Sequence, residues 1–395
     1  MSQNTLPQKT TTLMVGTTKG AFLLTSDSDR IKWSVAGPFC DGWPINHMAA
    51  DTTVGTYWAA GGGEWPGAGV WRSDNGTDWT LSKLANGKFD ALLRDDPALA
   101  AEFGMEPAPP APFTGEIDAL WSLAHVGDTL FAGAKPAALY ASHDGGDTWD
   151  KVPSLSDHPS ADSWEPGGAG LTLHTIVTAA DTPEKMWVGI SAAGVFATED
   201  GGKTWERRNR RDNQGNAPEH DHGGTPGACG HEVGHCVHNM VRAAPGTGAA
   251  GDLLYQQNHH GVFRSPDGGR SWSEISAGLP STFGFPIAVH PRDPATLWVL
   301  PLNGDMAGRY PPDASAAVWM SRDGGDTWSA RRDGLPARNC FFTVLRQAMT
   351  TDRAESVGVY FGTNSGSVFA STDSGETWRE VARHLPTVLC VEALT

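Results

Sequence analysis

One eight-residue pattern, S-x-D-x-G-x-T-W, recurs along this 395-residue chain and limits its possible folds more than any other feature. Five close copies occupy residues 142–149, 198–205, 265–272, 321–328 and 371–378, and two weaker copies occupy 25–33 and 72–79. In such a pattern Ser and Asp form local hydrogen bonds to the backbone of a tight turn, and Gly supplies the positive φ that the turn needs. The Trp begins a strand and buries a large ring. Regular repetition therefore predicts repeated β-structure rather than two or three unrelated domains.

The pattern resembles the Asp-box family, also called the bacterial neuraminidase repeat (BNR). Longer stretches such as CVHNM and QNHHGVFRS are similar to a group of bacterial sialidase-like proteins labelled as glycosyl hydrolases. The resemblance implies an all-β fold, a seven-bladed β-propeller with four strands in each blade. We letter the strands of a blade A to D from the channel outward, so that each Asp box is a C–D turn.

The two ends of the chain complement each other. The N-terminal repeat has no A strand before it, and the C-terminal segment LPTVLCVEAL matches an A strand with nothing after it. We therefore expect both ends to share blade one, with the last strand closing the ring, which leaves no open sheet edge. The expected organisation is a single propeller domain over residues 1–395.

Strand polarity separates the repeated aspartates from the long loops. In antiparallel blades the C–D turns lie on one face, whereas the D–A connections and B–C turns lie on the other. We therefore predict a structural role for the box aspartates, which are Asp27, Asp74, Asp144, Asp200, Asp267, Asp323 and Asp373. The extended insertions all belong to the opposite face, where rigid scaffolds usually carry binding sites; they are 83–118, 153–170, 206–236 and 303–315.

Candidate metal ligands emerge when the predicted A strands are aligned. We place these strands at 46–51, 119–125, 171–177, 237–243, 285–290 and 341–346. One position of the alignment then holds His47, Trp121, His174, His238, Pro286 and Phe342. Neutral imidazole binds divalent metals, and three His with an open position suit a metal that activates water. We predict a divalent metal site, with zinc as the expected ion, held by His47, His174 and His238, with His259 as a fourth ligand. A metal-free polar site made of the same residues is the alternative.

Polar residues of the loops complete the predicted site. Asp305 is a candidate general base or metal ligand, and Arg309 is a candidate for binding an anionic group or a developing oxyanion. Further candidates for contact with a substrate are Trp121, Lys135, Asn258, Asn303 and Tyr310.

The segment 220–238 contains five His together with Cys229 and Cys236. Its HEVGH stretch has the lettering of a zinc protease helix, but Gly234 and the strand that follows argue against a helix. Glu232 remains a candidate catalytic base, and the two Cys with nearby His are candidates for a second, structural metal.

The family resemblance leaves the reaction open, because a fold does not fix a function. The F/Y-R-I-P motif of sialidases is absent, and no three Arg fall at the starts of A strands. Three functions remain. The first, which we favour, is a hydrolase of a small ester, lactone or amide. The second is a sialidase-like or carboxylate-pair glycoside hydrolase using two of Asp305, Glu64, Glu116 and Glu165. The third is a non-catalytic scaffold for protein binding or assembly.

Composition narrows the partners and the compartment. A net charge of −16 argues against nucleic acid and against an anionic membrane surface. The first residues contain no apolar core of a signal peptide, and the chain has no run of eighteen apolar residues. Five scattered Cys imply no disulfide framework. We expect a cytoplasmic protein that acts on a small molecule.

Overall fold

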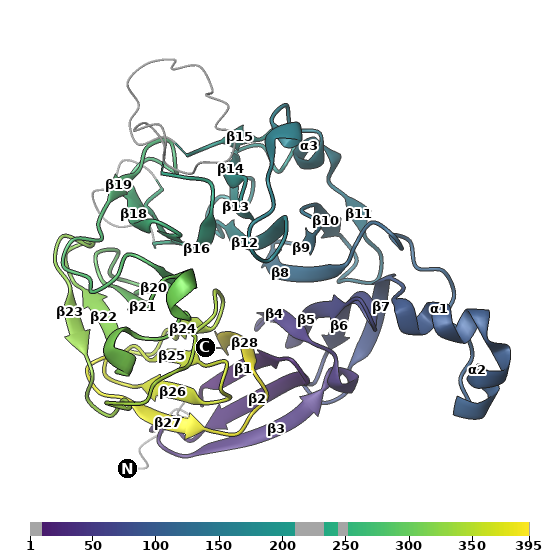
Figure 1. Cartoon of the computed structure of the whole chain (residues 1–395), viewed down its shortest axis with the longest axis horizontal. Coiled ribbons are helices and arrows are strands. Elements are labelled where there is room, and N and C mark those ends of the chain that lie inside the picture. The colour runs from purple at the N-terminus through teal and green to yellow at the C-terminus, as the bar shows by residue number, and fades with distance from the viewer. Residues whose placement is uncertain (1–9, 210–232, 244–251, 395) are drawn as a thin grey trace, which may run out of the picture.

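The computed structural model describes residues 10–209, 233–243 and 252–394. It contains seven four-stranded antiparallel sheets arranged around a ring (Figure 1). The innermost strands of successive sheets contact each other all the way round this ring. The prediction of a seven-bladed β-propeller is confirmed.

The first three blades are listed here from the channel outward. Blade one consists of β28 (Val388–Leu394), β1 (Thr12–Thr17), β2 (Gly20–Ser26) and β3 (Trp33–Phe39). Blade two consists of β4 (Ile45–Asp51), β5 (Thr56–Gly63), β6 (Gly67–Ser73) and β7 (Thr80–Ala85). Blade three consists of β8 (Ala119–Val126), β9 (Thr129–Lys135), β10 (Leu139–Ser142) and β11 (Asp150–Lys151).

The remaining four blades have the same strand order. Blade four consists of β12 (Thr172–Thr178), β13 (Met186–Ser191), β14 (Gly194–Thr198) and β15 (Glu206–Arg207). Blade five consists of β16 (Val237–Arg242), β17 (Leu254–Asn258), β18 (Gly261–Ser265) and β19 (Ser273–Glu274). Blade six consists of β20 (Gly284–Val289), β21 (Leu297–Pro301), β22 (Val318–Ser321) and β23 (Ser329–Arg331). Blade seven consists of β24 (Met349–Thr351), β25 (Val359–Gly362), β26 (Val368–Ser371) and β27 (Arg379–Ala382).

The ring closes as the sequence predicts. The C-terminal strand β28 pairs antiparallel with β1, so both ends of the chain contribute to blade one. A buried ion pair fastens blade one to blade seven, because Arg30 Nη1 lies 2.6 Å from Asp352 Oδ2. Asp352 is completely buried and also accepts hydrogen bonds from the Tyr360 hydroxyl and the Gly358 amide.

The Asp boxes form the predicted turns. In blade three, Asp144 accepts hydrogen bonds from the amide and the hydroxyl of Thr148, which lower the pKa of its carboxyl group below the usual range. Trp side chains then join neighbouring blades: the fully buried Trp187 of blade four donates its indole N–H to the carbonyl of Gly268 in the box of blade five. The boxes are therefore structural units.

Blade two departs from the predicted box. Here Asn75, rather than Asp74, accepts the amide hydrogen bonds of the turn, from Thr77 and Asp78. Ser73 caps the amide of Gly76, three residues later, whereas in the five close copies Ser or Thr caps the amide four residues later. Counting back from the Trp misplaced the Asp by one residue, because this turn is one residue shorter.

The predicted A strand at 341–346 is wrong, since β24 begins only at Met349. Of the residues before it, Phe342 and Val344 are buried in the hydrophobic core without pairing in the sheet. Phe341 packs edge to face against Tyr310, with ring centroids 5.1 Å apart, and the Thr343 amide bonds to the Asn364 side chain.

The insertions carry the short helices. Between β7 and β8 lie α1 (Lys88–Asp95) and α2 (Pro97–Phe103), which project from the ring (Figure 1). Between β11 and β12 lies α3 (Pro153–Ser156). Two 3-10 turns, Asp305–Ala307 and Pro312–Ala314, lie between β21 and β22. Residues 210–232 of the insertion 206–236 lie outside the described part of the chain.

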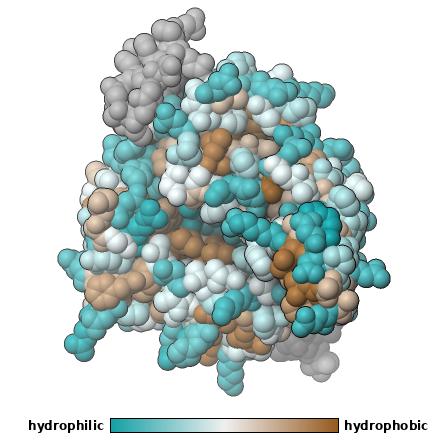
Figure 2. Space-filling model, turned by 45° about the vertical axis from the view of Figure 1, so that its right-hand side comes forward, coloured by the Kyte–Doolittle hydropathy of each residue, from teal (hydrophilic) through white to brown (hydrophobic). Residues whose placement is uncertain are grey.

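Hydrophilic side chains cover most of the face shown in Figure 2, and hydrophobic ones form separate patches. Several large apolar side chains in or beside the insertion that carries α1 and α2 remain exposed; they are Trp65, Leu92, Phe103 and Met105.

Candidate functional site

The start of each A strand in blades two to five contains a β-bulge, which is an extra residue with no partner on strand B. The bulged residues are Asn46, Trp121, His174 and His238. The predicted alignment is therefore right for blades three to five. It is wrong by one residue in blade two, where Asn46, not His47, is the equivalent of His238.

The physical reason lies in the residue before each bulge. Ile45, Leu120, Leu173 and Val237 are all completely buried. These apolar anchors fix the register of each strand. An alignment based on the histidines is wrong in blade two because it ignores the buried anchor Ile45.

His47 and His174 line the central channel. Its cavity has a volume of about 310 Å³ and is bordered by residues of several A strands. His47 accepts a hydrogen bond from the Leu123 amide at Nδ1, and its Nε2 lies 3.2 Å from a carboxylate oxygen of Glu392. His174 is buried, with Nδ1 2.9 Å from the Thr175 hydroxyl and no hydrogen-bond partner at Nε2.

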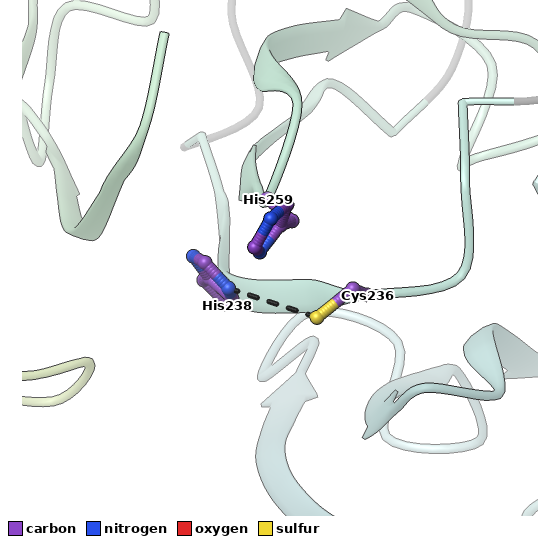
Figure 3. A group of neighbouring side chains, drawn as sticks. All are labelled: Cys236, His238 and His259. Atoms are coloured by element: carbon purple, nitrogen blue, oxygen red, sulfur yellow. Dashed lines mark hydrogen bonds between the residues drawn. The ribbon is translucent and has the colours of Figure 1, made fainter. Parts of the chain in front are cut away.

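A compact group of potential metal ligands lies elsewhere, in blade five. Cys236, His238 and His259 each present a ligand atom, and these three atoms lie within 4.8 Å of one another. Figure 3 shows Cys236 and His238 at the entry of β16, with the ring of His259 beside them. The His259 amide donates a hydrogen bond to the Cys236 carbonyl at 2.9 Å, which holds the B–C turn against the start of strand A. The structure thus brings together two of the four predicted ligands, His238 and His259, and adds Cys236.

The hydrogen bonds of His238 leave Nε2, the nitrogen that faces Cys236, available to bind a metal. Its Nδ1 lies 2.6 Å from the Gly284 carbonyl oxygen, so Nδ1 carries the proton and donates it. The lone pair of Nε2 is then directed at the cluster, 3.7 Å from Cys236 Sγ. Backbone carbonyls orient metal-binding imidazoles in this way. Burial lowers the pKa of His238 well below its usual value, which favours the neutral form that a metal requires.

The spacing suits a tetrahedral ion. Bond lengths of about 2.1 Å to nitrogen and 2.3 Å to sulfur place neighbouring donor atoms about 3.5 Å apart. The distance between Cys236 and His238 already meets this value. Burial raises the pKa of the Cys236 thiol, so the thiol is protonated when no metal is bound. Binding of a metal to the sulfur would release this proton.

Aromatic and cationic side chains surround this cluster. The ring of Phe285 lies 4.7 Å from that of His238, and the ring of Phe283 lies 5.2 Å from that of His259. The guanidinium carbons of Arg346 and Arg309 lie 5.0 and 5.7 Å from the centroid of Phe285. Sequence reasoning missed Arg346 and Phe285, because the first belongs to the segment wrongly predicted as a strand and the second precedes the proline used for alignment.

The other predicted residues occupy varied positions. Asp305 forms an exposed ion pair with Arg309 at 2.5 Å. The Asn258 side chain is fully buried and donates to the Gly234 carbonyl, which is a structural role. The backbone amide of Asn303 bonds to the Tyr310 carbonyl.

Two further predicted residues come from blade three. Trp121 occupies the bulge of β8, and its indole N–H is buried without a hydrogen-bond partner. Lys135 ends β9.

The HEVGH stretch is only partly described. Glu232, Cys229 and the His residues before Val233 lie outside the described residues. From Val233 to Cys236 the backbone is not helical, and Gly234 has a φ of +86°. The rejection of a zinc protease helix agrees with this part of the segment.

Comparison with known proteins gives a distant likeness. No family model matches the chain. A xyloglucanase from a Paenibacillus species is 26% identical over 238 residues, which cover 54% of this chain and 20% of the relative. The chain therefore spans only about a fifth of the length of this curated relative.

Solved structures share the fold at low identity. The GH74 xyloglucanase of Xanthomonas campestris has a TM-score of 0.58 at 17% identity, covering 95% of this chain and 53% of that one. A candidate 6-phosphogluconolactonase of Bacteroides uniformis has a TM-score of 0.54 at 11% identity, covering 98% and 100%. YCF48 of Cyanidioschyzon merolae has a TM-score of 0.51 at 11% identity, covering 86% of each chain. These likenesses support the propeller fold and include both hydrolases and a protein that is not named as an enzyme.

None of the helices in the described ranges is long and apolar enough to cross a membrane.

Proposed function

We propose that this protein is a metal-dependent hydrolase of a small molecule that contains an ester, lactone or amide bond. The observation that supports the proposal is the tautomer of His238. Its Nδ1 proton is held by the Gly284 carbonyl, so Nε2 faces Cys236 and His259 with its lone pair free.

Zinc is the ion that fits this donor set best, because one thiolate and two imidazoles leave a fourth position open. Bound there, zinc supplies a water of lowered pKa and polarises the carbonyl of the substrate. The predicted ligand set is thereby revised to Cys236, His238 and His259, while His47 and His174 belong to the channel.

The protein side chains supply the remaining steps. Asp305 is the described carboxylate whose charge acts on Cys236, and we assign to it the proton of the attacking water. Attack on the carbonyl carbon forms the new C–O bond. Cleavage of the bond to the alcohol or amine follows, and the leaving group takes the proton back from Asp305. Arg309, paired with Asp305 at 2.5 Å, orients that carboxylate.

Metal content tests the proposal directly. We expect about one zinc per chain in protein purified without an affinity tag, measured by elemental analysis. Cys236→Ser and His238→Ala should each lose the metal and any esterase or lactonase activity. Two matched controls should keep both: Cys340→Ser, at a buried thiol that donates to the Pro336 carbonyl, and His143→Ala, at an exposed site. Wild-type protein that binds no zinc, copper, iron or manganese would refute the proposal.

A glycoside hydrolase is the second candidate, and the partial similarity to a xyloglucanase favours it. Such an enzyme needs two carboxyl groups across a sugar-binding groove. Two predicted candidates are held in ion pairs, Glu64 with Lys88 and Glu116 with Lys151. Release of reducing sugar from xyloglucan that persists in Cys236→Ser, and that disappears in Asp305→Asn, would favour this candidate over the first.

A further inference from the structure

Arg346 lies beside the candidate metal site. Its Nε is shielded from solvent and meets no hydrogen-bond partner among the described residues. It forms no ion pair with any residue in the described ranges, whereas the neighbouring Arg309 is paired with Asp305. Loss of solvent lowers the pKa of Arg346 to about 10, so the guanidinium remains charged at neutral pH. A shielded charge of this kind costs stability unless an anion compensates it.

The surroundings hold this cation in place. The Arg346 carbonyl accepts a hydrogen bond from the Asn239 side chain at 2.7 Å, which ties its backbone to blade five. Its guanidinium carbon lies 5.0 Å from the centroid of the Phe285 ring. An aromatic ring stabilises a neighbouring cation but leaves its N–H donors available for an anion.

The same ring links the cation to the metal site. The ring centroids of Phe285 and His238 lie 4.7 Å apart, and the guanidinium carbon of Arg346 lies 5.0 Å from the centroid of Phe285. The Arg346 guanidinium and the His238 imidazole are therefore neighbours of the same ring. Arg309 approaches the Phe285 ring from the exposed loop, at 5.7 Å. Both guanidinium groups and the imidazole of His238 therefore lie around one aromatic ring.

We propose that Arg346, assisted by Arg309, binds an oxyanion group, a carboxylate or a phosphate, on the substrate. The inference rests on the proposed function only in naming the substrate: a small anionic ester, lactone or amide. Arginine suits this role because its planar fork of N–H groups matches two oxygens of a carboxylate or phosphate. Because the net charge of −16 makes the protein as a whole repel anions, anion binding requires a local cation such as Arg346.

Anion binding measured apart from catalysis tests the inference. Inorganic phosphate and acetate are titrated into the full chain by calorimetry at constant ionic strength, with sodium chloride as the compensating salt. We expect wild type to bind at least one of the two anions, and Arg346→Met to weaken that binding at least tenfold. Arg332→Met is the matched control, because the Arg332 guanidinium donates to the Ser315 hydroxyl and the Ala316 carbonyl on blade six and its loss should leave anion binding unchanged. Arg346→Met should melt at or above the wild-type temperature, since it removes an uncompensated charge.

Cys236→Ser separates this inference from the proposed function. It should lose zinc yet still bind the anion through Arg346. If Cys236→Ser abolishes phosphate binding while Arg346→Met preserves it, the anion sits on the metal and the inference is overturned. Wild type that binds neither anion at concentrations up to about 10 mM also overturns the inference, because a minimal specific contact should have a dissociation constant in the millimolar range. Wild-type protein that contains no zinc but still binds phosphate through Arg346 would refute the proposed function and leave this inference standing.

Discussion

Asp352 provides a sharp test of how the ring is held closed. Its carboxylate is completely buried and lies between blade seven and Arg30 of blade one. It accepts hydrogen bonds from Arg30, the Tyr360 hydroxyl, and the Gly358 and Ala354 amides, at 2.6 to 3.1 Å. Asp352→Ala therefore removes the acceptor of all these hydrogen bonds at once and leaves the largely buried guanidinium of Arg30 without its carboxylate.

The expected loss follows from this burial. Removal of one partner of a buried ion pair costs about 3–5 kcal/mol. An unfolding entropy of about 2.1 cal/mol/K per residue gives about 0.8 kcal/mol/K for 395 residues, so the melting temperature should fall by about 4–6 °C. Thermal and urea denaturation followed by tryptophan fluorescence would measure both quantities.

An exposed pair of the same chemistry provides the control. Arg264 of blade five lies 3.3 Å from Asp326 of blade six, and the side chain of Asp326 is 65% exposed. Asp326→Ala should cost less than about 1 kcal/mol because water screens the pair. Equal effects of the two substitutions, or a loss below about 1 kcal/mol for Asp352→Ala, would refute the reasoning that burial makes the difference.

Two further predictions concern the turns. Hydrogen bonds from Thr side chains and amides lower the pKa of Asp200 and Asp323 to about 2, below the value of the unfolded chain, so their contribution to stability is complete above about pH 4 and is lost as the pH falls toward 2. Asp323→Asn should reduce the loss of melting temperature over that interval, and an unchanged acid profile would contradict the assignment. Gly366→Ala should destabilise far more than Gly201→Ala in thermal melts: both have positive φ, but a Cβ on Gly366 would lie 1.9 Å from the Leu385 carbonyl oxygen, whereas Gly201 faces open space. Similar losses would contradict the role of the contact.

Much of the fold was predictable because the Asp box encodes its turn locally. The hydrogen bonds of Asp144 all fall within five residues, so one short pattern specifies them wherever it occurs. The failure in blade two has the same origin, since Asn75 satisfies the same amides in a turn one residue shorter. The failure in blade seven arose because Phe342 and Val344 enter the buried core without pairing in the sheet, a tertiary use that periodicity does not reveal.

The candidate site was less predictable because its parts converge from separate loops. His238 and His259 could be selected from residue type and expected position. Cys236 was noted only as a member of a Cys- and His-rich segment. Arg346 becomes notable only when its lack of a counter-ion is seen, and that is a property of the assembled structure.

Blade four shows why a histidine at the bulge does not by itself make a metal site. His174 and His238 occupy the same bulge position, after the buried Leu173 and Val237. In blade five the strand entry supplies Cys236, and the residue after Asn258, the partner of Val237, is His259. The same two places in blade four hold Thr172 and Ser191, which are paired with each other across the strands.

The hydrogen bonds of the two histidines differ accordingly. His174 turns Nδ1 to the hydroxyl of its neighbour Thr175, and its Nε2 has no hydrogen-bond partner within the described ranges. His238 turns Nδ1 to the Gly284 carbonyl of the next blade and Nε2 to a thiol. The bulge recurs at the start of strand A in blades two to five, but the ligand set depends on the strand entry and the B–C turn together. Blade five has a thiol and two imidazoles at these three places, whereas blade four has two hydroxyls and one imidazole, and this combination distinguishes a candidate binding site from a repeated structural feature.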